Sequence, residues 1–342
     1  MAGHQVLVTG GAGYIGVHTL VELMNAGAEP IVVDDLSRGS MRLLDGAERI
    51  AGRRPIFHRV DCADRNQLKS VFDQHPGIQS VIHFAAFKSV IESVENPLLY
   101  YQNNMGSLLS LMEIMRQVGV NRLVFSSSCT VYGQPDQIPV GEDAPFKRPE
   151  SPYGATKQMG EQILQDLVRG WKDLRVVSLR YFNPVGAHPS GLIGELPVGV
   201  PNNLVPYITQ TAIGKRDALT IFGSDYDTPD GTCLRDFIHV VDLAVAHVKA
   251  MEAMDRLPQR FEAINLGSGV PCSVLELVKT FIKETGVNLN YVMGPRRPGD
   301  IEKVYADPGK SFRLLNWKTA RSTEDGLRDA WNWEQKLEHA PH

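Results

Sequence analysis

Tyr153 and Lys157, four residues apart in the segment 151–157, are of types that can move a proton together. A four-residue gap puts both side chains on one face of a helix. Ser151 is a good N-cap and Pro152 suits a first helical turn, so the sequence predicts a helix that begins here. An ammonium near a phenol favours the phenolate, so we expect Lys157 to lower the pKa of Tyr153 from about 10 toward neutrality. The pair is a candidate proton-transfer site for an alcohol or ketone, although on spacing alone an ordinary exposed helix is the simpler interpretation.

Three glycines near the N-terminus predict a turn that holds a dinucleotide. Residues 6–8 form an apolar run typical of a buried strand, and residues 17–24 have the apolar periodicity of a helix. The glycines between these two segments are Gly10, Gly13 and Gly16. Glycines at these places let the backbone turn tightly and approach a pyrophosphate at the positive end of the helix.

The carboxylate after the next predicted strand supports the same interpretation. The apolar run 31–33 ends in Asp34, where a dinucleotide-binding unit places the acid that binds the adenosine ribose hydroxyls. Asp34 and Asp35 would repel a 2′-phosphate, which favours NAD over NADP, although the nearby Arg38 leaves that preference open. Strand, glycines, helix, strand and acid in this order predict a dinucleotide site far better than a lone glycine triplet would.

A run of serines follows another predicted strand. Residues 121–125 are apolar enough for a strand that opens into the polar segment 126–133. Because ligands bind at the carboxyl ends of parallel strands, we expect Ser128 to reach the reacting oxygen beside Tyr153. Ser126 and Ser127 fit equally well as a polar exit from the strand. The cofactor glycines, the serine and the Tyr-Lys pair come in the order found in hydride-transfer enzymes.

Length and composition limit the class of protein. The chain has 342 residues, long enough for one large or two moderate domains. With 43% hydrophobic and 22% charged residues it is typical of a soluble globular protein, and a net charge of -4 argues against nucleic-acid or anionic-membrane partners. No stretch approaches a membrane span, and the first residues lack a signal-peptide core.

The cysteines point to no metal site. They lie at Cys62, Cys129, Cys233 and Cys272, without paired metal-ligand spacing. Free thiols in a reducing cytosol are the simplest account. Cys129 follows Ser128 directly, but we expect it to be a small buried side chain rather than a nucleophile.

The alternation of strand-like and helical segments predicts an α/β fold with a doubly wound parallel (Rossmann) sheet. The further predicted strands lie at 53–61, 80–84 and 175–179. After Arg180 the chain becomes rich in Pro, Gly and Asn, so we expect a dinucleotide-binding domain over 1–184 and a smaller α/β substrate domain over 185–342. The strand-like runs 238–242 and 263–267 could return to the first domain, which would join segments near 235–267 to it.

Arg235, Arg296 and Arg297 would suit a doubly anionic diphosphate if they lay near a pocket. Scattered arginines in an acidic protein are more often solvated surface, so these three decide nothing alone.

Several segments together carry a family resemblance. The glycine turn 10–16, the serines 126–128, Tyr153 and Lys157 resemble the extended short-chain dehydrogenase/reductases. Within that family, the segments 180–191, 201–204 and 231–239 resemble the UDP-glucose 4-epimerases. The resemblance covers nearly the whole chain, and the first of these three segments is highly specific.

The resemblance implies interconversion of UDP-galactose and UDP-glucose on a tightly held NAD, in a cytoplasmic homodimer. Tyr153 would remove the proton of the sugar 4-hydroxyl while the C4 hydride passes to NAD⁺, and the 4-keto sugar would turn and take the hydride back on its other face. Ser128 would hold the oxygen, and Lys157 would bind the nicotinamide ribose and tune Tyr153.

The resemblance also assigns binding residues. Those for the cofactor are Gly10, Gly13, Tyr14, Ile15, Gly16, Asp34, Asp35, Leu36, Asp61, Cys62, Phe84, Ala85, Lys88, Asn103, Ser126, Tyr153, Lys157 and Phe182. Those for the UDP-hexose are Lys88, Ser128, Tyr153, Asn183, Asn203, Leu204, Thr220, Ile221, Phe222, Arg235, Arg297, Asp300 and Val304.

Val304 bears on substrate choice. In the family, the residue four places after the aspartate of the segment 296–300 faces the sugar C2 substituent, and a small residue there goes with acceptance of N-acetyl sugars. Val304 holds this place and Tyr305 follows it, but Pro298 replaces the usual glutamate, so the register could differ by one residue. The alternative is that Val304 only packs a strand.

Two rival functions remain open. A nucleotide-sugar 4,6-dehydratase on the same fold would need an acid and a base to expel the C6 hydroxyl, which that family supplies as Asp-Glu straight after the serine or threonine. The related decarboxylases usually place Glu at the second of these positions, and this chain has Cys129 and Thr130 there. A non-catalytic dinucleotide sensor would have no need to keep Ser128, Tyr153 and Lys157 together.

Overall fold

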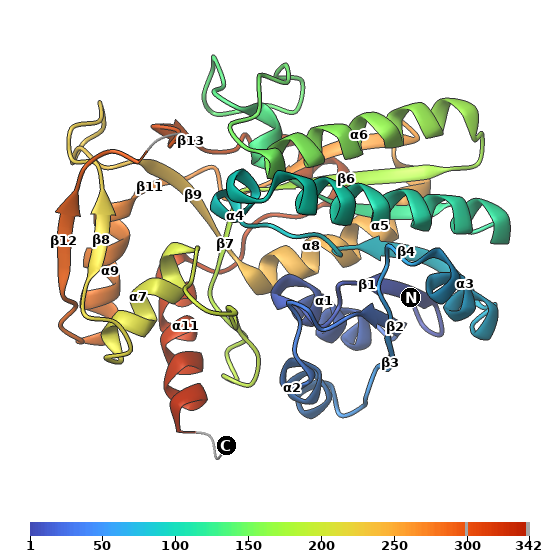
Figure 1. Ribbon diagram of the computed structural model, residues 1–342, viewed down its shortest axis with the longest axis horizontal. Coiled ribbons are helices and arrows are strands. Elements are labelled where there is room, and N and C mark those ends of the chain that lie inside the picture. The colour runs from blue at the N-terminus through green and yellow to red at the C-terminus, as the bar shows by residue number, and fades with distance from the viewer. Residues whose placement is uncertain (298–299, 340–342) are drawn as a thin grey trace.

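A computed structural model describes residues 1–297 and 300–339 (Figure 1). Its larger part is a seven-stranded sheet in the order β10-β6-β5-β4-β1-β2-β3, with every neighbouring pair parallel. The strands are β1 (Gln5–Thr9), β2 (Glu29–Asp34), β3 (Ile56–Arg59), β4 (Ile78–His83), β5 (Arg122–Ser128), β6 (Arg175–Tyr181) and β10 (Phe261–Leu266). The strand order reverses between β1 and β4, which is where an open α/β sheet forms its ligand crevice.

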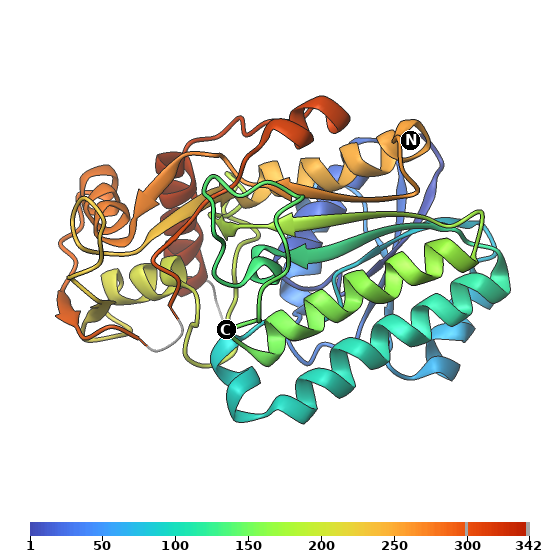
Figure 2. The same ribbon diagram turned by 90° about the horizontal axis from the view of Figure 1, so that it is seen from above.

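Helices cover both faces of this sheet. The helices on one face are α1 (Tyr14–Asn25), α2 (Met41–Ala51) and α8 (Val240–Ala253); those on the other are α3 (Arg65–Gln74), α5 (Pro97–Val118) and α6 (Pro152–Gly170). Side chains alternate between the two cores because successive residues of a strand face opposite ways. Val6 and Val8 of β1 pack with the first set of helices and Leu7 with the second. Figure 2 shows α5 and α6 side by side along one face.

The smaller part, on the left of Figure 1, is built around β9 (Leu234–His239). β9 pairs in parallel with β7 (Asn183–Val185) and β13 (Lys303–Val304), and antiparallel with β11 (Pro271–Ser273). β8 (Leu219–Phe222) and β12 (Tyr291–Gly294) form a separate parallel pair. The helices packed here are α7 (Leu204–Ala212), α9 (Val274–Thr285) and α11 (Thr323–Glu338).

Four short helical segments complete the described chain. They are α4 (Val90–Glu95), the 3₁₀ turns η1 (Cys129–Tyr132) and η2 (Met254–Arg256), and α10 (Gly309–Leu315), which packs on α8 and β10. None of the helices within the described ranges combines the length and apolar character needed to cross a bilayer.

The doubly wound parallel sheet with a smaller α/β part, predicted from the sequence, is confirmed. Three local expectations need correction. The predicted strand 53–61 is reduced to β3, since Pro55 lacks the N–H that a strand would need there. β5 does not open at Ser126 but continues to Ser128, because β6 pairs with it along its whole length. The run 238–242 is split, since β9 ends at His239 and α8 begins at Val240, whereas the run 263–267 returns to the large sheet as β10.

Candidate functional site

A cavity of about 1050 Å³ lies over the carboxyl ends of the large sheet and extends to the smaller part. Its lining joins the glycine turn after β1, the acidic end of β2, the loop after β4 and the start of α6. On the other side it is lined by residues of β8, β9, β13 and the segment before α7. This volume is at the upper end of the range for small-molecule sites, which suits two large ligands together.

The glycine turn leaves no room for side chains. A Cβ on Gly10, whose φ is +69°, would lie 2.7 Å from the Ala85 nitrogen, and one on Gly16 would lie 2.4 Å from the Gly10 oxygen. Gly13 is the N-cap of α1 and provides no side-chain hydrogen bond, so the first N–H groups of the helix stay open beside the cavity. This bare helix N-terminus is a cradle that fits a pyrophosphate.

The end of β2 is held rigidly. Asp34 accepts hydrogen bonds from the backbone N–H of Ala12 at 3.0 Å and of Leu36 at 2.9 Å, and burial raises the pKa of its carboxyl. Arg38, which left the NADP question open, forms an ion pair with Glu92 at 2.5 Å and lies over the Phe87 ring. The positive charge of Arg38 is therefore already paired with the Glu92 carboxylate.

The predicted helix at the Tyr-Lys pair is confirmed as α6. The Ser151 hydroxyl caps it by accepting from the Gly154 N–H, and Pro152 is its first residue. Tyr153 and Lys157 both line the cavity. The Lys157 ammonium donates to the carbonyl and hydroxyl of Ser126 at 2.6 and 3.2 Å, and lies 5.8 Å from the centre of the Tyr153 ring.

The pKa that we expected for Tyr153 is wrong for this structure. Burial raises the pKa of Tyr153 to about 12, and a hydrogen bond with Ser128 only partly opposes it. Burial also lowers the pKa of Lys157 to about 7, against the pull of Glu161. Because both groups are desolvated, each favours its neutral form, and the ammonium is directed at Ser126 rather than at the phenol.

The three serines of β5 have three different roles. Ser126 and Ser127 both line the cavity. Ser126 lies beside Lys157, whereas the Ser127 hydroxyl donates to the buried carboxylate of Glu161 at 2.6 Å. The Ser128 hydroxyl accepts from the Thr130 N–H at 3.2 Å and is hydrogen-bonded to Tyr153. Ser128 does not itself line the cavity, and its link to the site is the hydrogen bond with Tyr153.

The cysteine next to Ser128 is not an activated thiol. Burial raises the pKa of Cys129 to about 12. All four cysteines are free. Within residues 1–297 and 300–339, no group of three or more His, Cys, Asp or Glu side chains could hold a metal ion.

Beneath the serines lies a buried ion pair. Arg180 donates to both carboxylate oxygens of Glu161, at 2.9 and 2.7 Å, and the Ser178 hydroxyl donates to one of them. The Glu161 side chain is completely buried, and Arg180 is only 4% exposed. Arg180 is further held by the Tyr132 hydroxyl, so this charge pair has its hydrogen bonds satisfied.

Most residues that the sequence assigned to binding line the cavity, and four do not: Leu36, Ser128, Phe182 and Ile221. Ile221 is 1% exposed because β8 alternates, directing Thr220 and Phe222 to the cavity and Ile221 to the core. Phe182 packs in an apolar cluster that includes Val304.

The substrate side carries two of the three arginines. Arg297 pairs with Asp300 at 2.6 Å and lies over the Phe222 ring, and Arg235 donates to the Ile301 carbonyl at 2.6 Å. Arg297, Asp300 and Arg235 line the cavity. Arg296 does not, since it pairs with Asp225 and stacks on a neighbouring tyrosine.

Asn183, Leu204 and Val304 also line this side, whereas Tyr305 does not, so the register of the two residues favours Val304. Pro298, on which the expected shift of register depended, lies outside the described residues.

Sequence reasoning missed Glu195. This residue lines the cavity, and its carboxylate joins Lys88 at 2.8 Å to Asn203 at 2.6 Å. Nothing in the local sequence signals the role, because Lys88 is 107 residues away along the chain and Asn203, eight residues away, lies beyond a loop with no regular spacing. The apolar residues at the same mouth were missed as well: Val90, Ile91, Val94, Val198 and Val200.

Comparison with known proteins gives one consistent result. Residues 6–267 match the NAD dependent epimerase/dehydratase family. The chain is 50% identical over 332 residues to UDP-glucose 4-epimerase 2 of Arabidopsis thaliana, covering 96% of this chain and 94% of that protein. It is similar to the crystal structure of UDP-glucose 4-epimerase from Stenotrophomonas maltophila with bound NAD and formylated UDP-arabinopyranose, with a TM-score of 0.95, 45% identity and coverage of 99% and 100%. The enzyme from Bifidobacterium longum in complex with NAD⁺ and UDP gives a TM-score of 0.94 at 44% identity, with coverage of 97% and 98%.

Proposed function

The chain belongs to the NAD dependent epimerase/dehydratase family, and we propose that it interconverts UDP-galactose and UDP-glucose on a resident NAD. The observation that carries this proposal is a single cavity that joins a bare helix N-terminus, Tyr153 with Lys157, and the arginines of the smaller part. The relatives with these names match the chain over nearly its whole length.

The residues present fit NAD. Gly10 and Gly16 allow the close backbone packing of the turn, and Gly13 leaves the N-terminus of α1 without a side-chain cap, as a pyrophosphate bound there needs. Asp34 and Asp35 line the cavity and would bind the adenosine ribose hydroxyls and repel a 2′-phosphate. Asp61, Cys62, Phe84, Ala85 and Asn103 would line the rest of its path. When bound, NAD supplies acceptance and return of a hydride.

The proton chemistry falls to α6 and β5. Tyr153 would take the proton of the sugar 4-hydroxyl and later return it to the 4-oxygen, when the hydride comes back to the opposite face of the 4-keto sugar. Ser128, hydrogen-bonded to Tyr153, would hold the same oxygen. Since burial alone keeps the phenol protonated, Tyr153 needs positive charge beside it to act as a base. Lys157, whose nitrogen lies 5.8 Å from the centre of the Tyr153 ring, would provide that charge when it is protonated.

The substrate side would hold the UDP group rather than the sugar. Arg235 and Arg297 would bind the diphosphate, Asp300 the ribose, and Thr220 and Phe222 the uridine, with Asn183, Asn203 and Leu204 along the sugar diphosphate. A sugar bound mainly through its diphosphate is free to present both faces in turn.

The rival dehydratase is not favoured. The residues that would need to be carboxylic acids are Cys129, whose thiol pKa is raised by burial, and Thr130, whose buried hydroxyl has no hydrogen-bond partner among the described residues. Neither can serve as the acid or base that expels a C6 hydroxyl.

We also propose a homodimer in a reducing cytoplasm. We propose that the smaller domain begins near residue 185 and that, of the segments near 235–267, α8 and β10 join the first domain while β9 stays in the smaller one. Apolar side chains that α5 and α6 expose support the dimer, and these are Leu98, Leu99, Leu109, Val118 and Met159. Light scattering of the wild type, and of Leu98→Lys and Leu109→Lys together, tests it; a monomeric wild type contradicts it.

We further propose that UDP-N-acetylgalactosamine is a second substrate. Val304 lines the cavity beside residues assigned to the sugar and is small enough to leave room for an acetamido group.

The test of the function needs no added cofactor. We expect the purified protein to contain NAD, to convert UDP-galactose to UDP-glucose without supplement, and to accumulate no NADH. Stoichiometric NADH formation would indicate a dehydrogenase, and loss of water from the sugar a dehydratase.

A further inference from the structure

We propose that Glu195 is a positioning residue for the nucleotide sugar: its carboxylate holds Lys88 and Asn203 from opposite sides of the cavity. This inference rests on the proposed function. One carboxylate oxygen accepts from the Lys88 ammonium at 2.8 Å and from the Asn203 amide at 2.6 Å. Lys88 lies in the loop between β4 and α4, and Asn203 is the N-cap of α7 in the smaller part.

Stability alone is a weak reason for this contact. The Lys88 side chain is 53% exposed, and ion pairs with one partner so exposed contribute little to folding. Glu195 itself is only 12% exposed, so the carboxylate is held in place while the lysine that it binds remains open to the cavity. This ion pair therefore fixes the direction of the Lys88 side chain more than it stabilises the fold.

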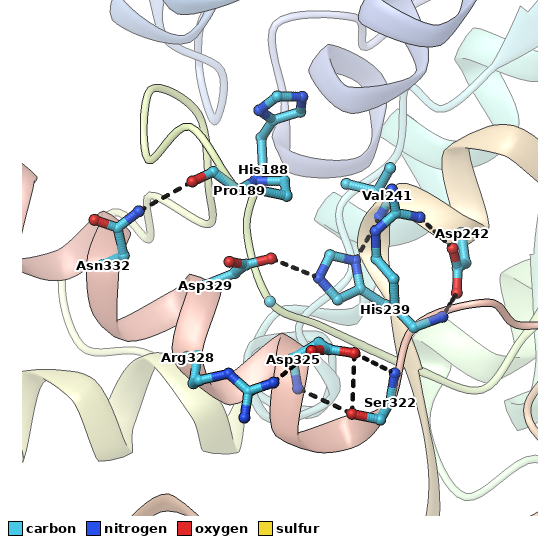
Figure 3. Close-up of polar contacts among 12 residues, drawn as sticks. His188, Pro189, His239, Val241, Asp242, Ser322, Asp325, Arg328, Asp329 and Asn332 are labelled. Atoms are coloured by element: carbon cyan, nitrogen blue, oxygen red, sulfur yellow. Dashed lines mark hydrogen bonds and ion pairs between the residues drawn. The ribbon is translucent and has the colours of Figure 1, made fainter. Parts of the chain in front are cut away.

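The backbone around Glu195 is fixed from behind by α11. Trp333 donates its indole N–H to the Glu195 carbonyl at 2.9 Å, and Asn332 and Lys336 donate to the carbonyls of Pro189 and Ser190 at 3.2 and 2.6 Å. Figure 3 shows Asn332 directed at Pro189, one turn from Asp329, which contacts His239 at the end of β9. These hydrogen bonds hold the segment 186–195 against α11. The Glu195 carboxylate therefore contacts Lys88 from a fixed backbone position.

The hydrogen bonds to Glu195 leave both partners able to bind a ligand. An ammonium has three N–H donors, so Lys88 keeps two after contacting Glu195. The Asn203 amide gives one N–H to Glu195, which also decides that its nitrogen and not its oxygen faces the carboxylate. Within the described part of the chain its side chain makes no other hydrogen bond, so its oxygen and second N–H remain for the sugar diphosphate.

The chain supplies a matched control in Glu334. This carboxylate also joins one lysine and one neutral donor, Lys215 at 2.9 Å and the Thr209 hydroxyl at 3.1 Å, and its side chain is 4% exposed. It lies outside the main cavity. Glu334 and Glu195 both line a small second pocket, so Glu334→Gln reports what loss of a neighbouring buried carboxylate does to the fold while the residues of the main cavity stay unchanged.

The experiment measures the dissociation constants of UDP and UDP-galactose by titration calorimetry, together with KM, kcat and Tm. Glu195→Gln, Glu334→Gln, Lys88→Met and the double variant Lys88→Met/Glu195→Gln are compared with the wild type as purified holoenzymes. We expect Glu195→Gln to weaken UDP-galactose binding and raise KM by about tenfold with kcat changed less, since one charged hydrogen bond is lost. Glu195→Ala is expected to do at least as much and replaces it if the glutamine variant does not fold.

Because Glu195 acts in part through Lys88, its substitution should have a smaller effect on the Lys88→Met background than in the wild type, with the remainder acting through Asn203. The proposal is overturned if Glu195→Gln binds like the wild type, if it changes Tm and kcat without changing binding, or if its effect multiplies in full with that of Lys88→Met. A wild type that binds UDP-galactose but does not epimerise it refutes the proposed function, and the dissociation constants then still decide the role of Glu195.

Discussion

The two sides of the cavity are built in different ways. On the cofactor side, functional residues lie at the carboxyl ends of β1, β2, β4 and β5, which are neighbours in one parallel sheet. On the substrate side they come from β8, β9 and β13, short strands from two separate small sheets, and from loops between them. One side is a regular frame, and the other is assembled from contacts between distant segments.

The charges of the two sides differ accordingly. On the cofactor side, Glu161 and Arg180 satisfy each other out of contact with water. On the substrate side, Arg297 is 44% exposed and keeps donors for a ligand although it contacts Asp300. A fixed frame suits a resident cofactor, and an adaptable set of cations suits a sugar diphosphate that must let its hexose turn.

The largest expected effect is at the place where the two sides meet. Tyr153→Phe should lower kcat by about 10²–10⁴-fold while NAD stays bound, because it removes the phenolic proton carrier and leaves the packing of the ring. Turnover and bound NAD are measured for this variant and for Tyr291→Phe, a tyrosine of β12 outside the cavity. Near-normal turnover of Tyr153→Phe would remove Tyr153 from the mechanism.

The next effect concerns the buried ion pair of Glu161 and Arg180 on the cofactor side. Glu161→Gln should cost about 3–5 kcal/mol of unfolding free energy, because it leaves the Arg180 charge buried without its partner. Asp225→Asn, which breaks the exposed pair with Arg296 on the substrate side, should cost far less, because solvent screens that pair. Urea unfolding of both variants at neutral pH gives the comparison, and equal losses would contradict it.

The different construction of the two sides of the cavity also explains which parts of the site could be predicted from the sequence. The glycine turn, Asp34 and the Tyr153–Lys157 helix depend on local spacing, and the structure forms the predicted strand-turn-helix, strand end and helix at these places. The direction of the Tyr153 pKa was not predictable, because burial depends on the whole fold and outweighs one charge at helical spacing. Glu195 could not be found either, since only the tertiary structure brings Lys88 and Asn203 to it.

A smaller effect is expected at acid pH, which should destabilise the cofactor side of the cavity before the substrate side. Burial lowers the pKa of His83 to about 3, with the Lys157 charge acting in the same direction. Because the folded pKa lies below the unfolded value of about 6.5, the stability from the neutral imidazole is complete above pH 6.5 and is lost as pH falls toward 3. At pH 4.5 the loss is about 3 kcal/mol for this histidine.

His83→Gln should therefore lose less stability than the wild type between pH 7 and pH 4.5. Urea unfolding at the two pH values measures the difference. Hydrogen exchange at pH 4.5 should show β4 opening before the strands of the substrate side. The same acid-induced loss in both proteins would mean that His83 is not the group that titrates.

The smallest expected effect tests the substrate side. Val304 is 4% exposed and lines the cavity. Val304→Tyr should lower kcat/KM for UDP-N-acetylgalactosamine by about 10–200-fold relative to UDP-galactose, because the larger ring takes the space for an acetamido group. The ratio of kcat/KM for the two substrates is measured in the wild type, in this variant and in Val292→Tyr, which places the same ring on β12 outside the cavity. A wild type inactive on the N-acetyl sugar, or a Val304→Tyr variant that loses both activities equally, would mean that Val304 only packs β13 against β9 and that substrate choice is set elsewhere on this side.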